Sequence, residues 1–328
     1  MGLKARDMNQ PRTAFVYLCD RKYHEMTQYS LCSLMEAADR PLHIHFFQYD
    51  YDLDCPRLEA MASELGHKLF RTPLEPNIAS EEFERGVGDG RHLHVTGTAF
   101  VKPFVVNRLA KTYDYVVYLD SDLLFFEALD WSQIEGFDEV AAGVLDFANF
   151  ARPEFYLHCV QNAVPPAYVN SGFLAFNARK WKEVGFLERY LENIRLHLEH
   201  CSYFDNCELR DQCPINMTIN GDIKILPLDM NVQQWALGTR FWDQATVRHY
   251  VGARKFLAPK MHTHDDRERQ LLLSLENDLQ LGLIDLPMQD FGIAHAMNNL
   301  RRQSKISSRS GMLEMYPSAR QPETAGVS

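Results

Sequence analysis

Two aspartates at the end of an apolar run are the residues of this chain with the clearest chemical potential. The run extends from Tyr115 to Leu119, and the aspartates follow at once in Asp120-Ser121-Asp122. An uninterrupted apolar run predicts a strand covered on both faces, and open α/β sheets place ligand sites at the carboxyl ends of their strands. Two carboxylates in that position form an oxygen-rich site suited to Mg²⁺ or Mn²⁺ holding a diphosphate. The alternative is a surface turn in which both aspartates accept bonds from backbone amides. Burial favours the metal site.

A later segment, His249 to Lys255, offers a third metal ligand and a cation, and it directly follows a predicted strand. A neutral imidazole from His249 suits Mn²⁺ better than Mg²⁺. Gly252 would let the backbone approach a phosphate closely, and Lys255 would supply a mobile positive charge for the same anion. Taken without the aspartates, the segment is explained equally well as a strand-to-loop turn with a hydrogen-bonded histidine.

Three further polar positions could take part in the same site. Asn170 stands in Asn170-Ser171-Gly172, before an expected strand, and its amide suits the paired hydroxyls of a sugar. Asp211 and Gln212 precede a helical stretch, where the alternative role for Asp211 is to cap the helix. Lys102 lies in the helix before the central strand and either reaches the phosphate or remains solvated.

The elements around these positions alternate between strand and helix, which predicts an α/β fold with helices on the faces of its sheet. The strand candidates are Thr13 to Cys19, Leu42 to Tyr49, Tyr115 to Leu119, Glu139 to Leu145, Gly172 to Asn177, Ile223 to Leu226 and Val247 to Tyr250. The helix candidates are His24 to Ala38, Pro56 to Gly66, Phe100 to Thr112, Lys180 to His200 and Asp265 to Gly282. The acidic stretch Pro73 to Arg91 is expected to be a loop, and Asp265 is expected to cap the last helix rather than to join His262 and His264 in a metal cluster.

Composition limits the class of protein. The chain has 328 residues, of which 46% are hydrophobic and 12% aromatic, so it can bury a sizeable core. The net charge of −10 argues against binding nucleic acid through a broadly basic face. An odd number of cysteines, seven, and a polar first segment (MGLKARDMNQ) indicate reduced thiols in a cytoplasm. The chain contains no run of about 20 apolar residues, so no membrane span is predicted.

In their order along the chain, the polar segments resemble glycosyltransferase family 8, the retaining transferases that use UDP-sugars and include bacterial lipopolysaccharide galactosyl- and glucosyltransferases. The resemblance covers about Thr13 to Lys255 and rests on five elements. They are Asp20 at the end of the opening strand, Asp120-Ser121-Asp122, Asn170-Ser171-Gly172, Asp211-Gln212, and the segment from His249 to Lys255. A single Asp-x-Asp motif is weak evidence, whereas five elements in the family's order are strong.

The resemblance implies a GT-A fold, in which a Rossmann-like mixed sheet flanked by helices is joined to an acceptor-binding half. It also implies transfer of a hexose, glucose or galactose, from a UDP-sugar to a glycan or glycolipid. Asp120, Asp122 and His249 would then hold Mn²⁺, or else Mg²⁺. The resemblance also implies that Asp20 and Tyr23 contact the uracil, and that Gly252 and Lys255 contact the β-phosphate. The residues implied to bind elsewhere on the donor are Lys102, Asp120, Ser121 and Asn170. Asn170, Asp211 and Gln212 would face the transferred sugar.

One departure from the family lies on the acceptor side. Family members often follow the lysine with Pro-Trp, whereas this chain continues Lys255-Phe256-Leu257. Two other classes stay open: a sugar-phosphate nucleotidyltransferase, which normally needs a glycine-rich loop that is absent after Cys19, and a non-catalytic nucleotide-sugar-binding protein.

The expected organisation is a GT-A catalytic domain over residues 1–264, a helical C-terminal extension over 265–300 and a disordered tail over 301–328. Arg301, Arg302, Lys305 and Arg309 give this tail a basic character that could attract anionic lipid and hold a cytoplasmic protein weakly at a membrane surface. Composition favours a solvated, disordered tail over this contact.

Overall fold

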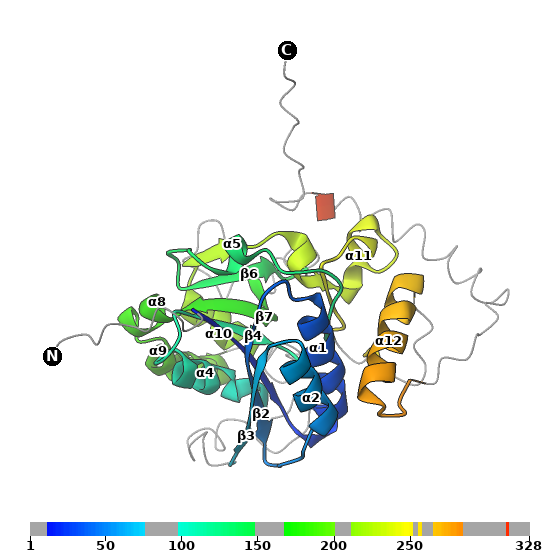
Figure 1. Cartoon of the computed structure of the whole chain (residues 1–328). Helices are drawn as coiled ribbons and strands as arrows, with labels where there is room; N and C mark the ends of the chain where they lie inside the picture. The colour runs from blue at the N-terminus through cyan, green and yellow to red at the C-terminus, as the bar shows by residue number, and fades with distance from the viewer. Residues whose placement is uncertain are drawn as a thin grey trace.

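The computed structural model of the protein describes residues 12–75, 98–147, 167–200, 211–251, 255–257, 265–284 and 313–314 (Figure 1). Gly252 and nearly all of the expected tail lie outside these ranges. So do most of the expected loop from Pro73 to Arg91 and the histidines at 262 and 264.

The main sheet has seven strands in the order β3-β2-β1-β4-β7-β6-β8. Strands β3, β2, β1 and β4 run parallel to one another, and β7 is antiparallel to both β4 and β6. The sheet is therefore mixed, as expected. Its strands are β1 (Thr13–Cys19), β2 (His43–Tyr49), β3 (Lys68–Leu74), β4 (Tyr115–Leu119), β6 (Ala141–Leu145), β7 (Val169–Asn177) and β8 (Ile223–Ile225).

The strand directions bring distant polar residues to one edge of this sheet. Leu119, the last residue of β4, pairs with Phe173 near the start of the antiparallel β7. Leu145, the last residue of β6, pairs with Val169 at the very start of β7. The residues that follow β4 and β6 and those that begin β7 therefore meet at the carboxyl edge, where ligand sites of such sheets lie.

A small second sheet continues from this edge. It has the order β5-β10-β9, with β5 (Leu123–Phe125), β9 (Val232–Gln233) and β10 (Val247–His249). Strand β10 is antiparallel to β5, and His249 pairs with Leu123. This register sets His249 beside Asp122, although the two residues are far apart in the sequence.

Helices cover both faces of the main sheet, and Figure 1 shows α1 and α2 on one side and α4, α8 and α9 on the other. Along β1, Phe15 and Tyr17 join the core under α1 and α2, while Ala14 and Val16 join the core under α4 and α9. This burial on both faces explains why nearly every residue of β1 is apolar. The helices are α1 (His24–Ala37), α2 (Pro56–Glu64), α4 (Thr98–Leu109), α5 (Trp131–Ile134), α8 (Ala178–Glu183), α9 (Phe186–His200), α10 (Gln212–Ile219), α11 (Arg240–Asp243) and α12 (Asp266–Leu279).

Three expectations about these elements were wrong. Strand β3 was not predicted, and its Pro73 had been assigned to the loop; β3 is an edge strand, where a proline costs no ladder bond. The helix expected over Lys180 to His200 is two helices, α8 and α9, because Gly185 adopts a left-handed conformation with φ of 60°. Strand β7 begins at Val169, so Asn170-Ser171-Gly172 lies within the strand rather than before it.

One other expectation, the cap of the last helix, was confirmed. Asp265 caps α12 by accepting a hydrogen bond from the Glu268 amide at 2.9 Å. No helix in the described ranges is long and apolar enough to cross a membrane. Within the segment expected to be disordered, Leu313 is buried and Glu314 pairs with Arg240 at 3.3 Å, so these two residues contact the folded body.

Candidate active site

Asp120, Asp122 and His249 come together at the carboxyl edge of β4. The Nε2 atom of His249 lies 3.2 Å from Asp122 Oδ1 and 4.0 Å from Asp120 Oδ2. One ligand atom from each of the three residues falls within 4.8 Å of the other two. Two carboxylates and one imidazole at this spacing could hold a hard or borderline divalent cation.

Gly172 makes this approach possible. A Cβ atom on Gly172 would lie 2.2 Å from His249 Cε1 and 2.8 Å from Asp120 Oδ2, so any side chain there would collide with both residues. The amide of Asp120 also donates to the Gly172 carbonyl at 2.8 Å, which fixes the first aspartate against β7. Glycine is thus needed at position 172 because His249 and Asp120 lie too close to the backbone for any side chain.

The ring of His249 is oriented by an amide. Its Nδ1 lies 3.1 Å from Asn231 Oδ1, and Asn231 Nδ2 in turn donates to Asn170 Oδ1 at 3.1 Å. An Asn oxygen only accepts, so Nδ1 of His249 carries the hydrogen. In the neutral ring, Nε2 then presents its lone pair to the aspartates, which is the arrangement of a metal-ligating histidine with an outer hydrogen bond.

Lys255 holds a positive charge at the same place. Its Nζ forms an ion pair with Asp122 Oδ2. Burial by itself would raise the pKa of Asp122, but the positive charge of Lys255 brings it below its usual range. Burial likewise opposes the charge on Lys255, and Asp122 outweighs it and raises the lysine pKa. The two residues are therefore charged together.

Lys102 is a second buried cation, and it bridges two acids. Its Nζ lies 3.0 Å from Asp120 Oδ1 and 2.9 Å from Asp211 Oδ2. Burial alone would lower its pKa, and the two carboxylates raise it instead. Burial raises the pKa of Asp211, an effect that Lys102 opposes. Asp211 precedes α10 but makes no side-chain capping bond, so the capping alternative was wrong.

Asn170 and Gln212 belong to one buried amide network. The Oε1 atom of Gln212 accepts from the Ser171 amide at 2.9 Å and from Asn170 Nδ2 at 3.2 Å. Asp146 Oδ2 accepts from Nδ2 of Asn170 and Nε2 of Gln212, each at 3.1 Å. The network links β6, β7 and α10 directly behind the carboxylate cluster.

The remaining predicted residues lie where the chain leaves β1. Asp20 accepts from the Lys22 amide at 3.0 Å and caps the short helix Arg21–Tyr23. Tyr23 is half-buried; burial raises its pKa, and Lys255 acts in the opposite direction. Ser121 is buried, with its Oγ 2.8 Å from the Thr27 hydroxyl at the start of α1. Gly252 lies outside the described residues.

Two residues of the site, Asp146 and Asn231, were not predicted from the sequence. Asp146 directly follows β6, so it carries the same signal as Asp120, an aspartate at the end of an apolar strand. Asn231 is the last residue of the short 3-10 helix Leu228–Asn231, and no spacing or motif distinguishes it.

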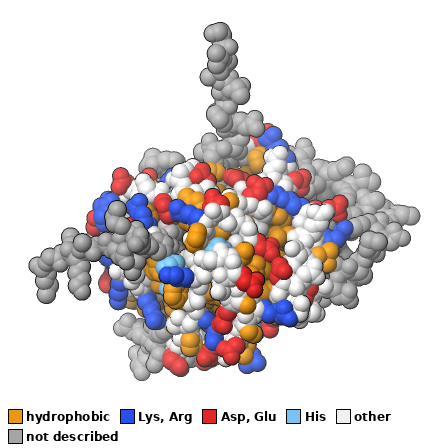
Figure 2. Space-filling model, viewed as in Figure 1, with side chains coloured by type: hydrophobic (Ala, Val, Ile, Leu, Met, Phe, Trp, Pro, Cys, Tyr) orange, Lys and Arg blue, Asp and Glu red, His pale blue; other side chains and the backbone are white. Residues whose placement is uncertain are grey.

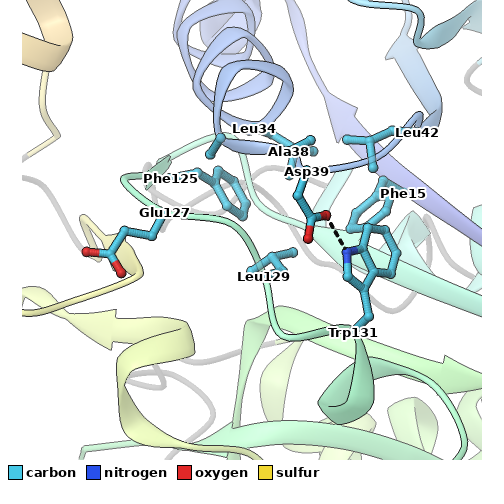
Figure 3. Close-up of a pocket in the computed structure, with 10 residues that line it drawn as sticks. Phe15, Leu34, Ala38, Asp39, Leu42, Phe125, Glu127, Leu129 and Trp131 are labelled. Carbon is cyan, nitrogen blue, oxygen red and sulfur yellow. Dashed lines mark hydrogen bonds between the residues drawn. The ribbon is translucent and has the colours of Figure 1, made fainter.

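A small pocket on another part of the molecule has a different character (Figure 3). Apolar side chains surround it between the end of α1, β1 and α5, and the indole of Trp131 donates across it to Asp39 at 2.9 Å. None of the predicted site residues lines this pocket. An apolar lining does not suit a diphosphate.

Acidic and basic side chains are interspersed over the face shown in Figure 2.

The mixed sheet flanked by helices, with an acid pair at the end of its central strand, has the GT-A fold of the solved glycosyltransferase structures to which it is similar. The chain belongs to glycosyl transferase family 8, whose sequence pattern matches residues 14–256. No curated protein matches it significantly in sequence.

Several solved structures share the fold at low identity. The galactosyltransferase LgtC, in complex with donor and acceptor sugar analogues, is 18% identical with a TM-score of 0.60; the match covers 84% of this chain and 98% of that one. The bifunctional WbbM is 15% identical with a TM-score of 0.58, covering 93% of this chain and 53% of that one. Mouse xyloside xylosyltransferase 1 is 13% identical with a TM-score of 0.52, covering 77% and 99%. Because galactosyl- and xylosyltransferases both appear, the fold does not fix the donor sugar.

Proposed function

We propose that the protein transfers a hexose, glucose or galactose, from a UDP-sugar to a hydroxyl of a glycan or glycolipid, with retention of configuration and with Mn²⁺ or Mg²⁺ in the site. The observation that carries this proposal is the convergence of Asp120, Asp122 and His249 at the edge where such sheets bind ligands. Membership of family 8 supports the reaction class.

The chemistry of the three side chains fits a divalent cation. His249 directs Nε2 at two carboxylates, and Asp122 is already matched by a cation, the ammonium group of Lys255. A cation held by these three residues would neutralise the developing charge of the departing diphosphate. Lys255, after giving up Asp122, would add its own charge on the β-phosphate, together with the backbone at Gly252.

The buried polar network would face the transferred sugar. Asp211 would present its carboxylate to the sugar hydroxyls, Asn170 would reach them by exchanging hydrogen bonds of the amide network, and Lys102 holds Asp211 and Asp120 in fixed relation. Asp20 and Tyr23, at the end of the neighbouring strand β1, would contact the uracil, with Ser121 between them and the sugar. These roles follow the family resemblance and the positions of the side chains.

Retention of configuration needs either a covalent intermediate or attack on the same face as departure. Gln212 is an amide and a weak nucleophile, and its Oε1 already accepts two hydrogen bonds. Both facts support same-face attack. The acceptor oxygen then forms a bond to the anomeric carbon as the bond to the β-phosphate oxygen breaks. The departing phosphate oxygen takes the acceptor's proton, leaving UDP and the glycoside.

We further propose the boundaries 1–264 for the catalytic domain, 265–300 for the helical extension and 301–328 for a basic tail. The tail would hold a cytoplasmic protein weakly at anionic membranes. Co-sedimentation with phosphatidylserine vesicles should fall when the chain is truncated after Leu300, and equal sedimentation of both forms would exclude this contact.

The central experiment combines the protein with Mn²⁺, a panel of UDP-sugars and candidate acceptors, and measures released UDP. UDP-glucose or UDP-galactose should be consumed, and UDP-xylose should be turned over poorly. Asp120→Ala should abolish turnover, whereas Asp138→Ala, at a surface aspartate that is 94% exposed, should not change it. Unchanged turnover in Asp120→Ala would overturn the proposal. Pyrophosphate released from UTP would indicate a nucleotidyltransferase, and binding without turnover a non-catalytic protein.

A further inference from the structure

The helix α12 lies beyond the segment that matches the family, and it packs beside α1 (Figure 1). Its Leu272, Leu275 and Leu279 are buried in the same core as Phe256 and Tyr250. The start of the helix also reaches the second sheet, because Glu268 pairs with Arg248 of β10, the strand that carries His249. This position raises the question of whether α12 acts on the metal site.

The first turn of α12 makes a buried ion pair with β10. Arg248 and Glu268 both have fully buried side chains, and Arg248 Nη1 lies 3.3 Å from Glu268 Oε2. The same nitrogen lies 2.7 Å from Asp265 Oδ2, at the cap of the helix. A buried guanidinium needs a carboxylate partner, and both of these partners come from the start of α12.

The guanidinium of Arg248 is also held in orientation. Its Nε donates to the Trp242 carbonyl at 3.0 Å. Its carbon atom lies 4.5 Å from the centre of the Phe126 ring and 4.8 Å from that of the Trp242 ring. The Nη2 atom has no hydrogen-bond partner among the described residues. The α12 carboxylates, one carbonyl and two rings therefore all contact the guanidinium group.

Arg248 and His249 are consecutive residues of one strand, so their side chains point to opposite faces of the sheet. Arg248 pairs with Leu124 and Val232, and His249 pairs with Leu123 and Gln233. Leu123 directly follows Asp122. A shift of Arg248 toward or away from α12 would therefore move both His249 and the backbone beside Asp122.

We propose that Glu268 is a positioning residue that acts through Arg248 to hold His249 in register with Asp120 and Asp122. This inference rests on the proposed metal site. It makes α12 a required part of that site, although the helix contributes no ligand. It also assigns a function to the one buried charge pair that joins the extension to β10 within the described residues.

The test is the affinity for Mn²⁺ of the full-length protein without nucleotide, measured from the electron paramagnetic resonance signal of free Mn²⁺. Glu268→Gln removes the charge and keeps the shape, and it should weaken Mn²⁺ binding about tenfold, as loss of an outer-sphere partner does. Turnover in this variant should recover at saturating Mn²⁺, because the ligands themselves are intact. Glu276→Gln is the matched control: it makes the same change two turns later on α12, beside Tyr29, and should leave the affinity unchanged.

The outcomes separate this inference from the proposed function. If the unaltered protein binds Mn²⁺ and folded Glu268→Gln binds it equally well, the positioning role is wrong and the metal site stands. If the unaltered protein binds no Mn²⁺, both fail. Circular dichroism and the unfolding temperature establish that each variant is folded. Should Glu268→Gln not fold, Glu268→Asp, which keeps the charge but withdraws it by one methylene, must show the same weakening, and unchanged affinity in it would equally refute the role.

Discussion

The Nδ1 atom of His249 lies 3.1 Å from the Oδ1 atom of Asn231, and this contact decides which ring nitrogen faces the aspartates. Because Asn231 also donates to Asn170, the orientation of the histidine is tied to the amide network behind the site. The metal ligands and the residues proposed to meet the sugar are therefore parts of one hydrogen-bonded assembly.

Replacing Asn231 with leucine should release the ring of His249. The imidazole would then populate both tautomers and rotate, and affinity for Mn²⁺ should fall about tenfold. Isothermal titration with MnCl₂ measures the change. Asn231→Asp provides the comparison, since its carboxylate still accepts the Nδ1 hydrogen and should retain more of the affinity than leucine. Equal binding by the leucine variant and the unaltered protein would contradict the proposed orientation.

Gly172→Ala should damage the site without touching a ligand. The new Cβ would lie 2.2 Å from His249 Cε1, so the imidazole must move away from the two carboxylates. We expect turnover to fall at least about a hundredfold, as displacement of a reacting geometry by about 1 Å does. Steady-state kinetics with UDP-sugar and Mn²⁺ would test this expectation.

Gly143→Ala, in the neighbouring strand β6, is the matched control. There the nearest atom, at 2.7 Å, is Cδ2 of Leu174, the far end of a flexible side chain. The substitution should cost about 1–3 kcal/mol of unfolding free energy through overpacking and leave turnover per folded molecule unchanged. Equal losses of activity in the two variants would mean that Gly172 matters for packing alone.

The sequence predicted the main sheet and the acid pair because the signals were local. The apolar run ending at Leu119 is buried on both faces, and a strand of that kind can be recognised from its own residues. Strand β3 was missed because it is an edge strand whose residues are mostly part-exposed, so its hydrophobic pattern is weak.

The parts of the site that could not be predicted depend on strand pairing over long distances. Gly172 is required only because β7 runs antiparallel to β4, and His249 faces Asp122 only because β10 pairs with β5. Asn231 acquires its role from the same pairing, through β9. Asp146 is the exception, since an aspartate at the end of a predicted strand was visible in the sequence.

Lys255→Met should have opposite effects on metal binding and on turnover. In the present structure Lys255 pairs with Asp122, so the lysine and a divalent cation compete for one carboxylate. Removing the ammonium group should tighten Mn²⁺ binding several-fold in the absence of nucleotide. Turnover should fall about a hundredfold, because the departing diphosphate loses a counter-charge. Mn²⁺ titration and kinetics on the same preparation would detect the two effects, and a parallel loss of both properties would refute the competition.

Glu36→Gln should stabilise the protein in a pH-dependent way. Partial desolvation of its carboxyl group, followed by a hydrogen bond that protonated Glu36 donates to Asp278 of α12, raises the pKa of Glu36 from 4.5 to about 7, although the side chain is exposed to solvent. The unfolded chain therefore releases this proton at lower pH than the folded protein does. The contribution of Glu36 to stability is complete below its unfolded pKa and is lost as the pH rises through about 7.

A neutral glutamine avoids this loss. At pH 8 the variant should gain on the order of 1 kcal/mol in unfolding free energy; the gain is small because Glu36 is solvent-exposed. At pH 4 the two proteins should be equally stable. Urea unfolding at both pH values measures the difference. Glu64→Gln, at an exposed glutamate ending α2, controls for the change in net charge. A gain of the same size at both pH values would show that α1 and α12 do not share a proton between Glu36 and Asp278.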